Sequence, residues 1–123
     1  MKTVLIVEDQ ADIRKLIRMT LEFEPYEVHE AANGAEGLRL AIELAPDLIL
    51  LDVMMPGELD GLQVCARVRA QPALASTRVL LLTALSQPQD RDAGRQAGPD
   101  ATLIKPFSPL QLIETIDRLL PPA

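Results

Sequence analysis

The sequence predicts an α/β fold in which five parallel strands form one doubly wound sheet with helices on both faces. Short apolar runs alternate along the chain with segments whose apolar residues recur at helical spacing, and this alternation is typical of a parallel sheet. The run at 48–51 is apolar at consecutive positions, as expected for a strand that is covered on both faces. Polar residues directly follow several runs, at the edge where open α/β sheets bind ligands.

The first part of the chain predicts two strand–helix pairs. The β-branched run at 4–7 predicts the first strand, and apolar residues at helical spacing across 11–21 predict a helix with one buried stripe. The segment 26–31 alternates enough to form a second strand, which we expect near an edge of the sheet. After an Asn-Gly turn, apolar residues across 38–45 predict the second helix, which Pro46 ends.

The middle of the chain repeats this pattern. The strand at 48–51 leads into a loop that contains Pro56. Apolar residues at helical spacing across 62–68 predict the third helix, which Pro72 ends. The apolar run at 78–82 predicts the fourth strand.

The helix expected at 88–97 is poor in apolar surface. It is rich in charged residues and contains Gly94, which inside a helix costs about 1 kcal/mol relative to alanine. We therefore expect this helix to be marginal and mobile. Residues 101–104 predict the fifth strand, and a last helix with one apolar face begins at Pro109.

Topology rules leave few ways to connect these elements, because crossovers between parallel strands are right-handed. A chain of 123 residues with five strands fits the flavodoxin-like strand order 2-1-3-4-5. We expect residues 1–123 to form a single domain, with no output domain in this chain.

Composition and charge limit the classes of function. The formal net charge of −6 argues against a general binder of nucleic acid or of anionic membranes, because phosphates would be repelled. The single cysteine, Cys65, cannot form an internal disulfide and is expected in the core. No apolar run reaches transmembrane length, and we expect a cytoplasmic protein.

Functional side chains follow four of the expected strands. They are Glu8 and Asp9, Asp52, Thr83, and Lys105. In the order 2-1-3-4-5 the first and third strands are neighbours, so three carboxylates meet at one edge, and their repulsion favours a bound cation such as Mg²⁺. An acidic cluster alone is compatible with a solvated sheet edge, but a lysine and a hydroxyl at matching strand ends favour a functional site.

These residues lie in motifs that resemble those of response-regulator receiver domains, the phosphoacceptor domains of two-component signalling with a fold like that of chemotaxis regulators. The resemblance covers essentially the whole chain. It rests on the segments Val7-Glu8-Asp9, Asp52-Val53-Met54-Met55-Pro56-Gly57, Asp60-Gly61, Leu82-Thr83-Ala84, Gly98-Pro99-Asp100 and Lys105-Pro106-Phe107.

The resemblance implies that Asp52 accepts a phosphoryl group from a sensor histidine kinase or a histidine phosphotransfer protein. Lys105 would pair with one phosphoryl oxygen, and Thr83 would donate a hydrogen bond to another. The product would hydrolyse in water, so the domain would catalyse only its own phosphorylation and dephosphorylation and would not be an enzyme for another substrate.

The resemblance also implies a Mg²⁺ site. Asp9 would bind the ion directly and Glu8 through water, next to Asp52, while the backbone carbonyl of Met54 would complete the protein ligands. The ion would neutralise charge between the acceptor carboxylate and the incoming phosphoryl group.

We hypothesise that phosphorylation switches the face formed by the helix at 88–97, the strand at 101–104 and the last helix. Thr83 would move toward the phosphoryl group, and the weak helix is the element that little burial holds in place. The sequence does not identify the kinase, the signal or the effector, and it leaves open whether two copies form a homodimer.

Two features depart from the usual pattern of the family. Thr102 occupies the switch position that usually carries Tyr or Phe, so activation would proceed without an aromatic residue there. The loop at 56–61 is one residue longer than usual, and we expect the site to survive because Asp52 and Met54 precede the insertion. The resemblance also implies that Met54 and Leu85 occupy positions that tune dephosphorylation, and their apolar bulk predicts a long-lived phosphoryl group.

Two other functions compete with this interpretation. A phosphohydrolase with an aspartyl nucleophile often carries a second acid two residues later, and Met54 at that position argues against it. A degenerate receiver that binds partners without phosphorylation is disfavoured by the complete set of site residues, although Thr102 slightly favours it.

Overall fold

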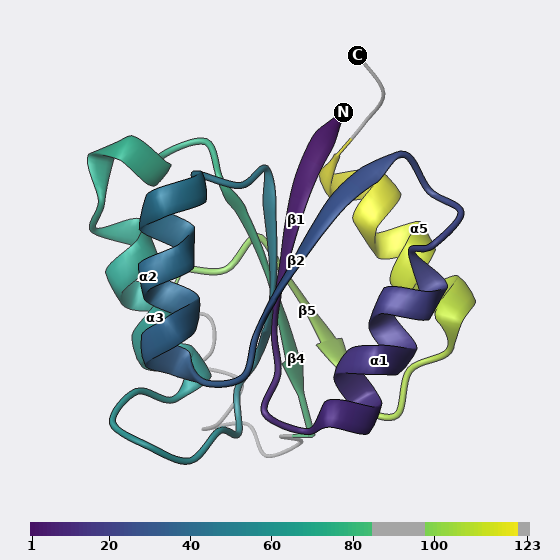
Figure 1. Cartoon of the computed structure of the whole chain (residues 1–123), viewed down its shortest axis with the longest axis horizontal. Coiled ribbons are helices and arrows are strands. Elements are labelled where there is room, and N and C mark those ends of the chain that lie inside the picture. Colours follow the sequence, from purple (N-terminus) through teal and green to yellow (C-terminus); the bar gives the residue numbers. More distant parts are fainter. Residues whose placement is uncertain (85–97, 121–123) are drawn as a thin grey trace.

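The computed structural model describes residues 1–84 and 98–120. These residues form three layers, in which a five-stranded parallel sheet lies between two pairs of helices (Figure 1). The predicted doubly wound α/β fold is therefore confirmed. Within the described residues, no helix combines the length and the apolar character needed to cross a membrane.

The sheet has the predicted strand order, β2-β1-β3-β4-β5, and neighbouring strands are parallel. The strands are β1 (Lys2–Val7), β2 (Tyr26–Ala31), β3 (Leu48–Asp52), β4 (Arg78–Thr83) and β5 (Ala101–Ile104). Every residue of β3 is buried, whereas β5 alternates between exposed and half-buried positions. The consecutive apolar run of β3 thus marks a central strand, and β5 is an edge.

Two pairs of helices bury the two faces of the sheet (Figure 1). The helices are α1 (Ala11–Thr20) and α5 (Pro109–Leu119) on one face, and α2 (Gly34–Leu44) and α3 (Gly61–Arg69) on the other. Leu48 and Leu50 belong to the apolar cluster that includes α1 and α5, whereas Ile49 and Leu51 belong to the cluster that includes α2 and α3. Cys65 of α3 is fully buried in the latter cluster, as predicted.

One boundary differs from the prediction. We expected Pro72 to end the third helix, but α3 ends at Arg69 and the segment Pro72–Leu74 forms a short 3-10 helix, η1. Pro72 has no N–H to donate, and it begins this new turn. The helix predicted at 88–97 and the residue Leu85 lie outside the described residues, so that part of the predicted switching face is not described.

Capping side chains fix where α3 and α5 begin. The side chain of Asp60 accepts a hydrogen bond from the Gln63 N–H, and the Gln63 side chain accepts one from the Asp60 N–H, both at 2.9 Å. Ser108 and Gln111 form the same reciprocal pair at the start of α5. Each capping box stabilises a helix start that closely follows the carboxyl edge of the sheet.

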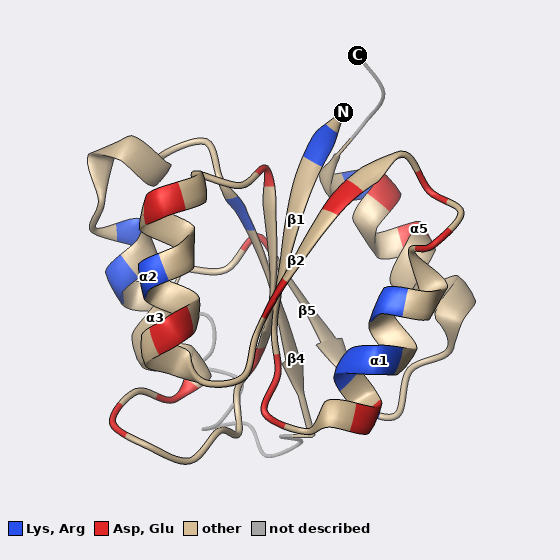
Figure 2. Cartoon of the chain, in the orientation of Figure 1, with Lys and Arg blue, Asp and Glu red and all other residues tan. Residues whose placement is uncertain are grey.

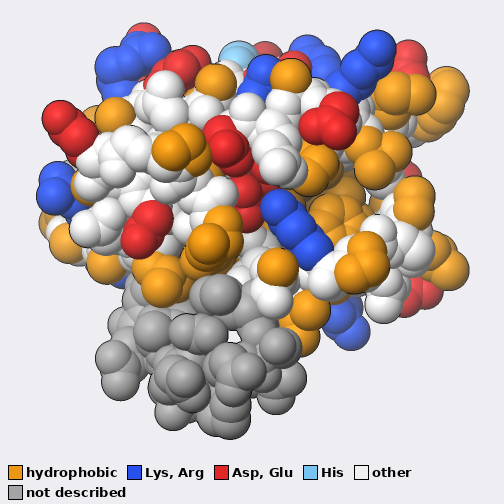
Figure 3. Space-filling model, turned by 90° about the horizontal axis from the view of Figure 1, so that it is seen from below, with side chains coloured by type: hydrophobic (Ala, Val, Ile, Leu, Met, Phe, Trp, Pro, Cys, Tyr) orange, Lys and Arg blue, Asp and Glu red, His pale blue; other side chains and the backbone are white. Residues whose placement is uncertain are grey.

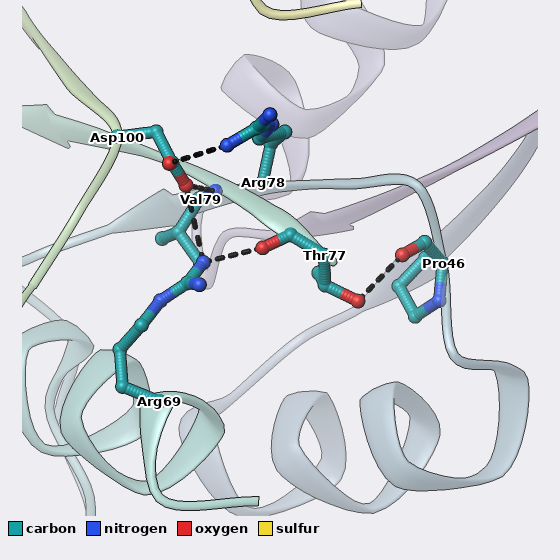
Figure 4. A network of polar contacts seen from close by, with 6 residues as sticks. All are labelled: Pro46, Arg69, Thr77, Arg78, Val79 and Asp100. Carbon is teal, nitrogen blue, oxygen red and sulfur yellow. Dashed lines mark hydrogen bonds and ion pairs between the residues drawn. The ribbon is translucent and has the colours of Figure 1, made fainter. Parts of the chain in front are cut away.

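A polar network anchors the amino ends of β4 and β5 to α3 (Figure 4). The Asp100 carboxylate accepts from the Val79 N–H at 2.8 Å, from Arg69 at 3.1 Å and from Arg78 at 3.3 Å. The network lies just before β5, and Lys105 lies just after it. It therefore helps to fix the position of the strand that carries Lys105 to the opposite edge.

Candidate functional site

The polar residues predicted at the strand ends lie together at the carboxyl edge of the sheet. Glu8 and Asp9 follow β1, Asp52 is the last residue of β3, Thr83 is the last residue of β4, and Lys105 follows β5. Acidic positions follow the end of β1 at the lower edge of Figure 2. Figure 3, which views the molecule from this side, shows acidic side chains near its centre with a basic side chain beside them.

Three carboxylates converge at this edge. Glu8, Asp9 and Asp52 each bring one carboxylate oxygen to within 4.8 Å of the others. Glu8 is 0% exposed and Asp52 is 3% exposed. The register explains this proximity, because Val7 at the end of β1 lies opposite Leu51 of β3.

Lys105 contacts two of the three carboxylates. Its Nζ lies 3.1 Å from Asp52 Oδ1 and 3.4 Å from Glu8 Oε2. Its backbone N–H donates to the carbonyl oxygen of Thr83 at 2.7 Å, which continues the pairing of β4 with β5. Strand register therefore places the Lys105 side chain over the acidic cluster.

The two threonines predicted to take part in switching have different surroundings. Thr83 is 5% exposed at the end of β4, whereas Thr102 is exposed on the edge strand. Thr102 lies opposite Leu81, while Thr83 lies opposite Ile104. The fold thus brings Thr83, but not Thr102, to the ends of the strands.

Crowding changes the acidity of Glu8. Burial raises the pKa of this carboxyl group to about 7, and the negative charge of Asp52 adds to the effect. Lys105 and the Gln10 N–H lower the pKa but do not cancel the increase. The site therefore disfavours a full set of ionised carboxylates unless more positive charge is present.

The residues of this site fit a hard divalent cation. Asp9 Oδ1 is buried and has no hydrogen-bond partner among the described residues, although buried polar atoms normally have one. The backbone of Met54 borders the site, because its N–H donates to Asp52 Oδ1 at 3.3 Å. Carboxylate and carbonyl oxygens are the ligands that Mg²⁺ prefers, and such sites usually retain water.

Two glycines allow the loop after β3 to pack tightly. A Cβ atom at Gly61 would lie 2.1 Å from the carbonyl oxygen of Asp52, and one at Gly34 would lie 2.2 Å from that of Leu59. The Gly61 N–H donates to the Val53 carbonyl at 3.0 Å. The start of α3 therefore rests directly on the end of β3, beside the assembled acidic cluster.

Arg14 is a residue that the sequence pattern did not single out. Its NH1 group donates to the backbone carbonyl of Glu8 at 2.7 Å. Its position in the sequence could have revealed it. Arg14 lies near the start of a helix that almost directly follows Glu8 and Asp9, so its long side chain can reach back to them.

The chain matches a known protein family over almost its whole length. The family model described as the response regulator receiver domain matches residues 4–117. Transcriptional regulatory protein ResD of Bacillus subtilis is 44% identical over 117 residues, which cover 95% of this chain and 47% of ResD. DNA-binding dual master transcriptional regulator RpaA of Synechocystis is 41% identical over 120 residues, which cover 98% of this chain and 49% of RpaA. The chain spans about half the length of these curated relatives.

Solved structures show the same fold. Chemotaxis protein CheY4 of Vibrio cholerae matches with a TM-score of 0.89 and 37% identity, and the match covers 98% of this chain and 99% of that one. The receiver domain of sensor histidine kinase PA1611 from Pseudomonas aeruginosa matches with a TM-score of 0.87 and 31% identity over 96% of both chains. That receiver was solved with a magnesium ion coordinated in its active site cleft.

Proposed function

The chain belongs to the response regulator receiver domain family, and on this premise we propose that it accepts a phosphoryl group on Asp52. Receiver domains are signalling domains of two-component systems that take a phosphoryl group onto an aspartate from histidine kinases and regulate output domains. The donor we propose is a sensor histidine kinase or a histidine phosphotransfer protein. The observation that carries the proposal is the buried Asp52 carboxylate with Lys105 Nζ at 3.1 Å.

Asp52 acts as the nucleophile. Its Oδ1 accepts from the Met54 N–H and from Lys105, and these contacts orient the carboxylate at the end of β3. A carboxylate oxygen forms the new bond to phosphorus while the phosphorus–nitrogen bond of the donor phosphohistidine breaks. The product is an acyl phosphate, and its hydrolysis restores the carboxylate.

Lys105 and Thr83 bind the transferred phosphoryl group. The Lys105 ammonium group, which contacts Asp52 and Glu8 in the structure, pairs with a phosphoryl oxygen, and such charge-assisted contacts are strong. The Thr83 hydroxyl group donates a hydrogen bond to another phosphoryl oxygen. Its movement toward the phosphoryl group transmits the effect of phosphorylation toward β5 and α5. Thr102 supplies no aromatic side chain, so this route depends on Thr83.

Mg²⁺ is the cofactor that we propose for this site. Asp9 and Asp52 would bind it directly, Glu8 would bind through water, and the backbone carbonyl of Met54 would complete the protein ligands. The ion, when bound, reduces the negative charge shared by the carboxylates and the phosphoryl oxygens. The oxygen of Asp9 without a described hydrogen-bond partner supports this assignment.

The output belongs to the same proposal. ResD and RpaA are named as transcriptional regulators. We propose that this receiver, in the cytoplasm, regulates either an attached output domain or a separate effector. Its own net charge of −6 argues against direct contact with nucleic acid.

Intact-mass measurement after incubation with acetyl phosphate tests the acceptor. Wild-type protein should gain one phosphoryl group with Mg²⁺ but not with EDTA, and Asp52→Ala should gain none. Asp117→Asn, which removes a carboxylate of α5 outside the acidic cluster, should be labelled like the wild type. A folded wild type that binds Mg²⁺ yet gains no phosphoryl group would contradict the proposal and favour a receiver that acts by binding partners alone.

A further inference from the structure

Arg14 of α1 joins two segments of the chain beside the acidic cluster. Its NH1 group donates to the Glu8 carbonyl at 2.7 Å, and its Nε donates to Glu30 Oε1 of β2 at 3.1 Å. The Arg14 side chain is only 20% exposed. Because the guanidinium group is a planar fork of donors, these two contacts hold it in a defined orientation between β1 and β2.

The bond to Glu8 acts on the peptide that links Glu8 to Asp9. A peptide group is planar, so fixing its carbonyl oxygen also fixes the direction in which the chain enters Asp9. The Glu8 N–H is held as well, because it donates to the Ala31 carbonyl at 3.1 Å. The backbone before Asp9 is thus held from both sides.

The Asp9 side chain depends on this backbone for its position. Asp9 Oδ1 is buried without a hydrogen-bond partner among the described residues, so no described side-chain contact of that atom orients the carboxylate. From these contacts we propose that Arg14 is a positioning residue that aligns Asp9 and Glu8 for Mg²⁺. This inference rests on the metal site of the proposed function.

Arg18 provides a matched comparison. It lies on the same helix and also pairs with Glu30, with NH1 2.9 Å from Oε2, but its backbone contact is with Val28 at 3.4 Å, not with Glu8. Figure 2 shows that α1 carries several basic residues. Replacing either arginine with glutamine removes one positive charge beside Glu30, but only Arg14→Gln removes the bond to the Glu8 carbonyl.

The sign of the effect separates positioning from electrostatics. Removing a positive charge near an acidic site should by itself strengthen the binding of a cation. Loss of alignment should weaken it, and loss of a residue that orients metal ligands typically costs 10–100-fold in affinity. The two explanations therefore predict opposite changes for Arg14→Gln.

Titration calorimetry with MgCl₂ on the whole chain tests this inference. Arg14→Gln should raise the dissociation constant about tenfold, whereas Arg18→Gln should leave it unchanged or slightly lower. Arg14→Lys keeps the charge but lacks the planar guanidinium group, and it should raise the constant by less than Arg14→Gln does. Thermal unfolding monitored by circular dichroism identifies any variant that does not fold. If a glutamine variant does not fold, the Mg²⁺ dissociation constants of Arg14→Lys and Arg18→Lys are compared instead.

Amide hydrogen exchange supplies a second measurement without metal. Arg14→Gln should accelerate exchange at the amides of Glu8 and Gln10, which donate to the Ala31 carbonyl and to Glu8 Oε1, and Arg18→Gln should not. If folded Arg14→Gln binds Mg²⁺ as tightly as the wild type or more tightly, the positioning role of Arg14 is wrong, but the metal site still stands. A wild type that does not bind Mg²⁺ would instead overturn the metal site on which the inference rests.

Discussion

Glu8 shows how burial changes the chemistry of a single residue. It is fully buried beside Asp52, and this environment raises its pKa to about 7. Lys105 lies 3.4 Å from Glu8 Oε2 and only partly offsets the effect. At the residue scale, the negative charge of Glu8 is therefore unfavourable in this site, and binding of a proton or a metal ion reduces the repulsion between the carboxylates.

The raised pKa predicts a pH dependence of stability in the absence of metal. The unfolded chain releases the Glu8 proton near its ordinary value of 4.5, and the folded chain releases it near 7. Between these values the folded state binds more protons, so the contribution of Glu8 to stability is present below about pH 4.5 and is lost as the pH rises through about 7. As the pH rises from about 5 to about 8, we expect the wild type to lose on the order of 2 kcal/mol of its free energy of unfolding relative to Glu8→Gln.

Urea denaturation in EDTA at about pH 5 and about pH 8 measures this difference. Glu58→Gln, which removes an exposed carboxylate from the loop after β3, is the matched control. If wild type and Glu8→Gln lose stability in parallel over this range, the raised pKa does not govern the pH response.

At the scale of elements, the junction of β3 and α3 determines the shape of the acceptor site. The Asp60–Gln63 capping box and Gly61 bring α3 against the end of β3. The Gly61 N–H bond to Val53 closes this junction. The position of Asp52 thus depends on a close backbone approach as well as on the strand itself.

This junction predicts a strong effect of a single methyl group. In Gly61→Ala the new Cβ would lie 2.1 Å from the Asp52 carbonyl oxygen and 2.6 Å from Val53 Cα, and backbone atoms cannot yield without moving the site. We expect a loss of about 3 kcal/mol in the free energy of unfolding together with weaker labelling by acetyl phosphate.

Gly57→Ala is the comparison for this prediction. Gly57 has φ of 108° but nothing within 4 Å of a new Cβ, so it should suffer backbone strain of about 1 kcal/mol without a clash. Chemical denaturation and intact-mass labelling of both variants would measure the difference. Equal losses in the two variants would show that the close approach at Gly61 is unimportant.

At the scale of the whole molecule, β5 links two distant polar groups. Its amino end follows Asp100, which is anchored to α3 and β4 (Figure 4). Its carboxyl end leads into Lys105 at the acidic cluster. The strand itself is short and half exposed, so apolar burial contributes less to its register than in β3. Polar anchoring at one edge of the sheet therefore supports the site at the other.

Removing the Asp100 carboxylate tests this anchoring. Asp100→Ala leaves the Val79 N–H and Arg69 without this acceptor, and we expect a loss of roughly 2 kcal/mol with faster amide exchange in β5. Arg78→Gln should cost less than about 1 kcal/mol, because the Arg78 side chain is 55% exposed. If the amides of β5 exchange as slowly in Asp100→Ala as in the wild type, Asp100 does not anchor this strand.

The sequence by itself determined the sheet, its strand order and the meeting of Glu8, Asp9, Asp52 and Lys105. Apolar periodicity reports which positions face the core, and parallel strands deliver the residues that follow them to one edge. These rules depend on local pattern and on topology, so they need no knowledge of side-chain contacts.

Only the tertiary structure decided the bond from Arg14 to Glu8, the close approach at Gly61, the anchoring of Asp100 and the raised pKa of Glu8. Each of these depends on how segments that are distant in sequence lie against one another. Hydrogen bonds and burial change over distances of an ångström or less, and residue type and spacing along the chain do not specify such distances.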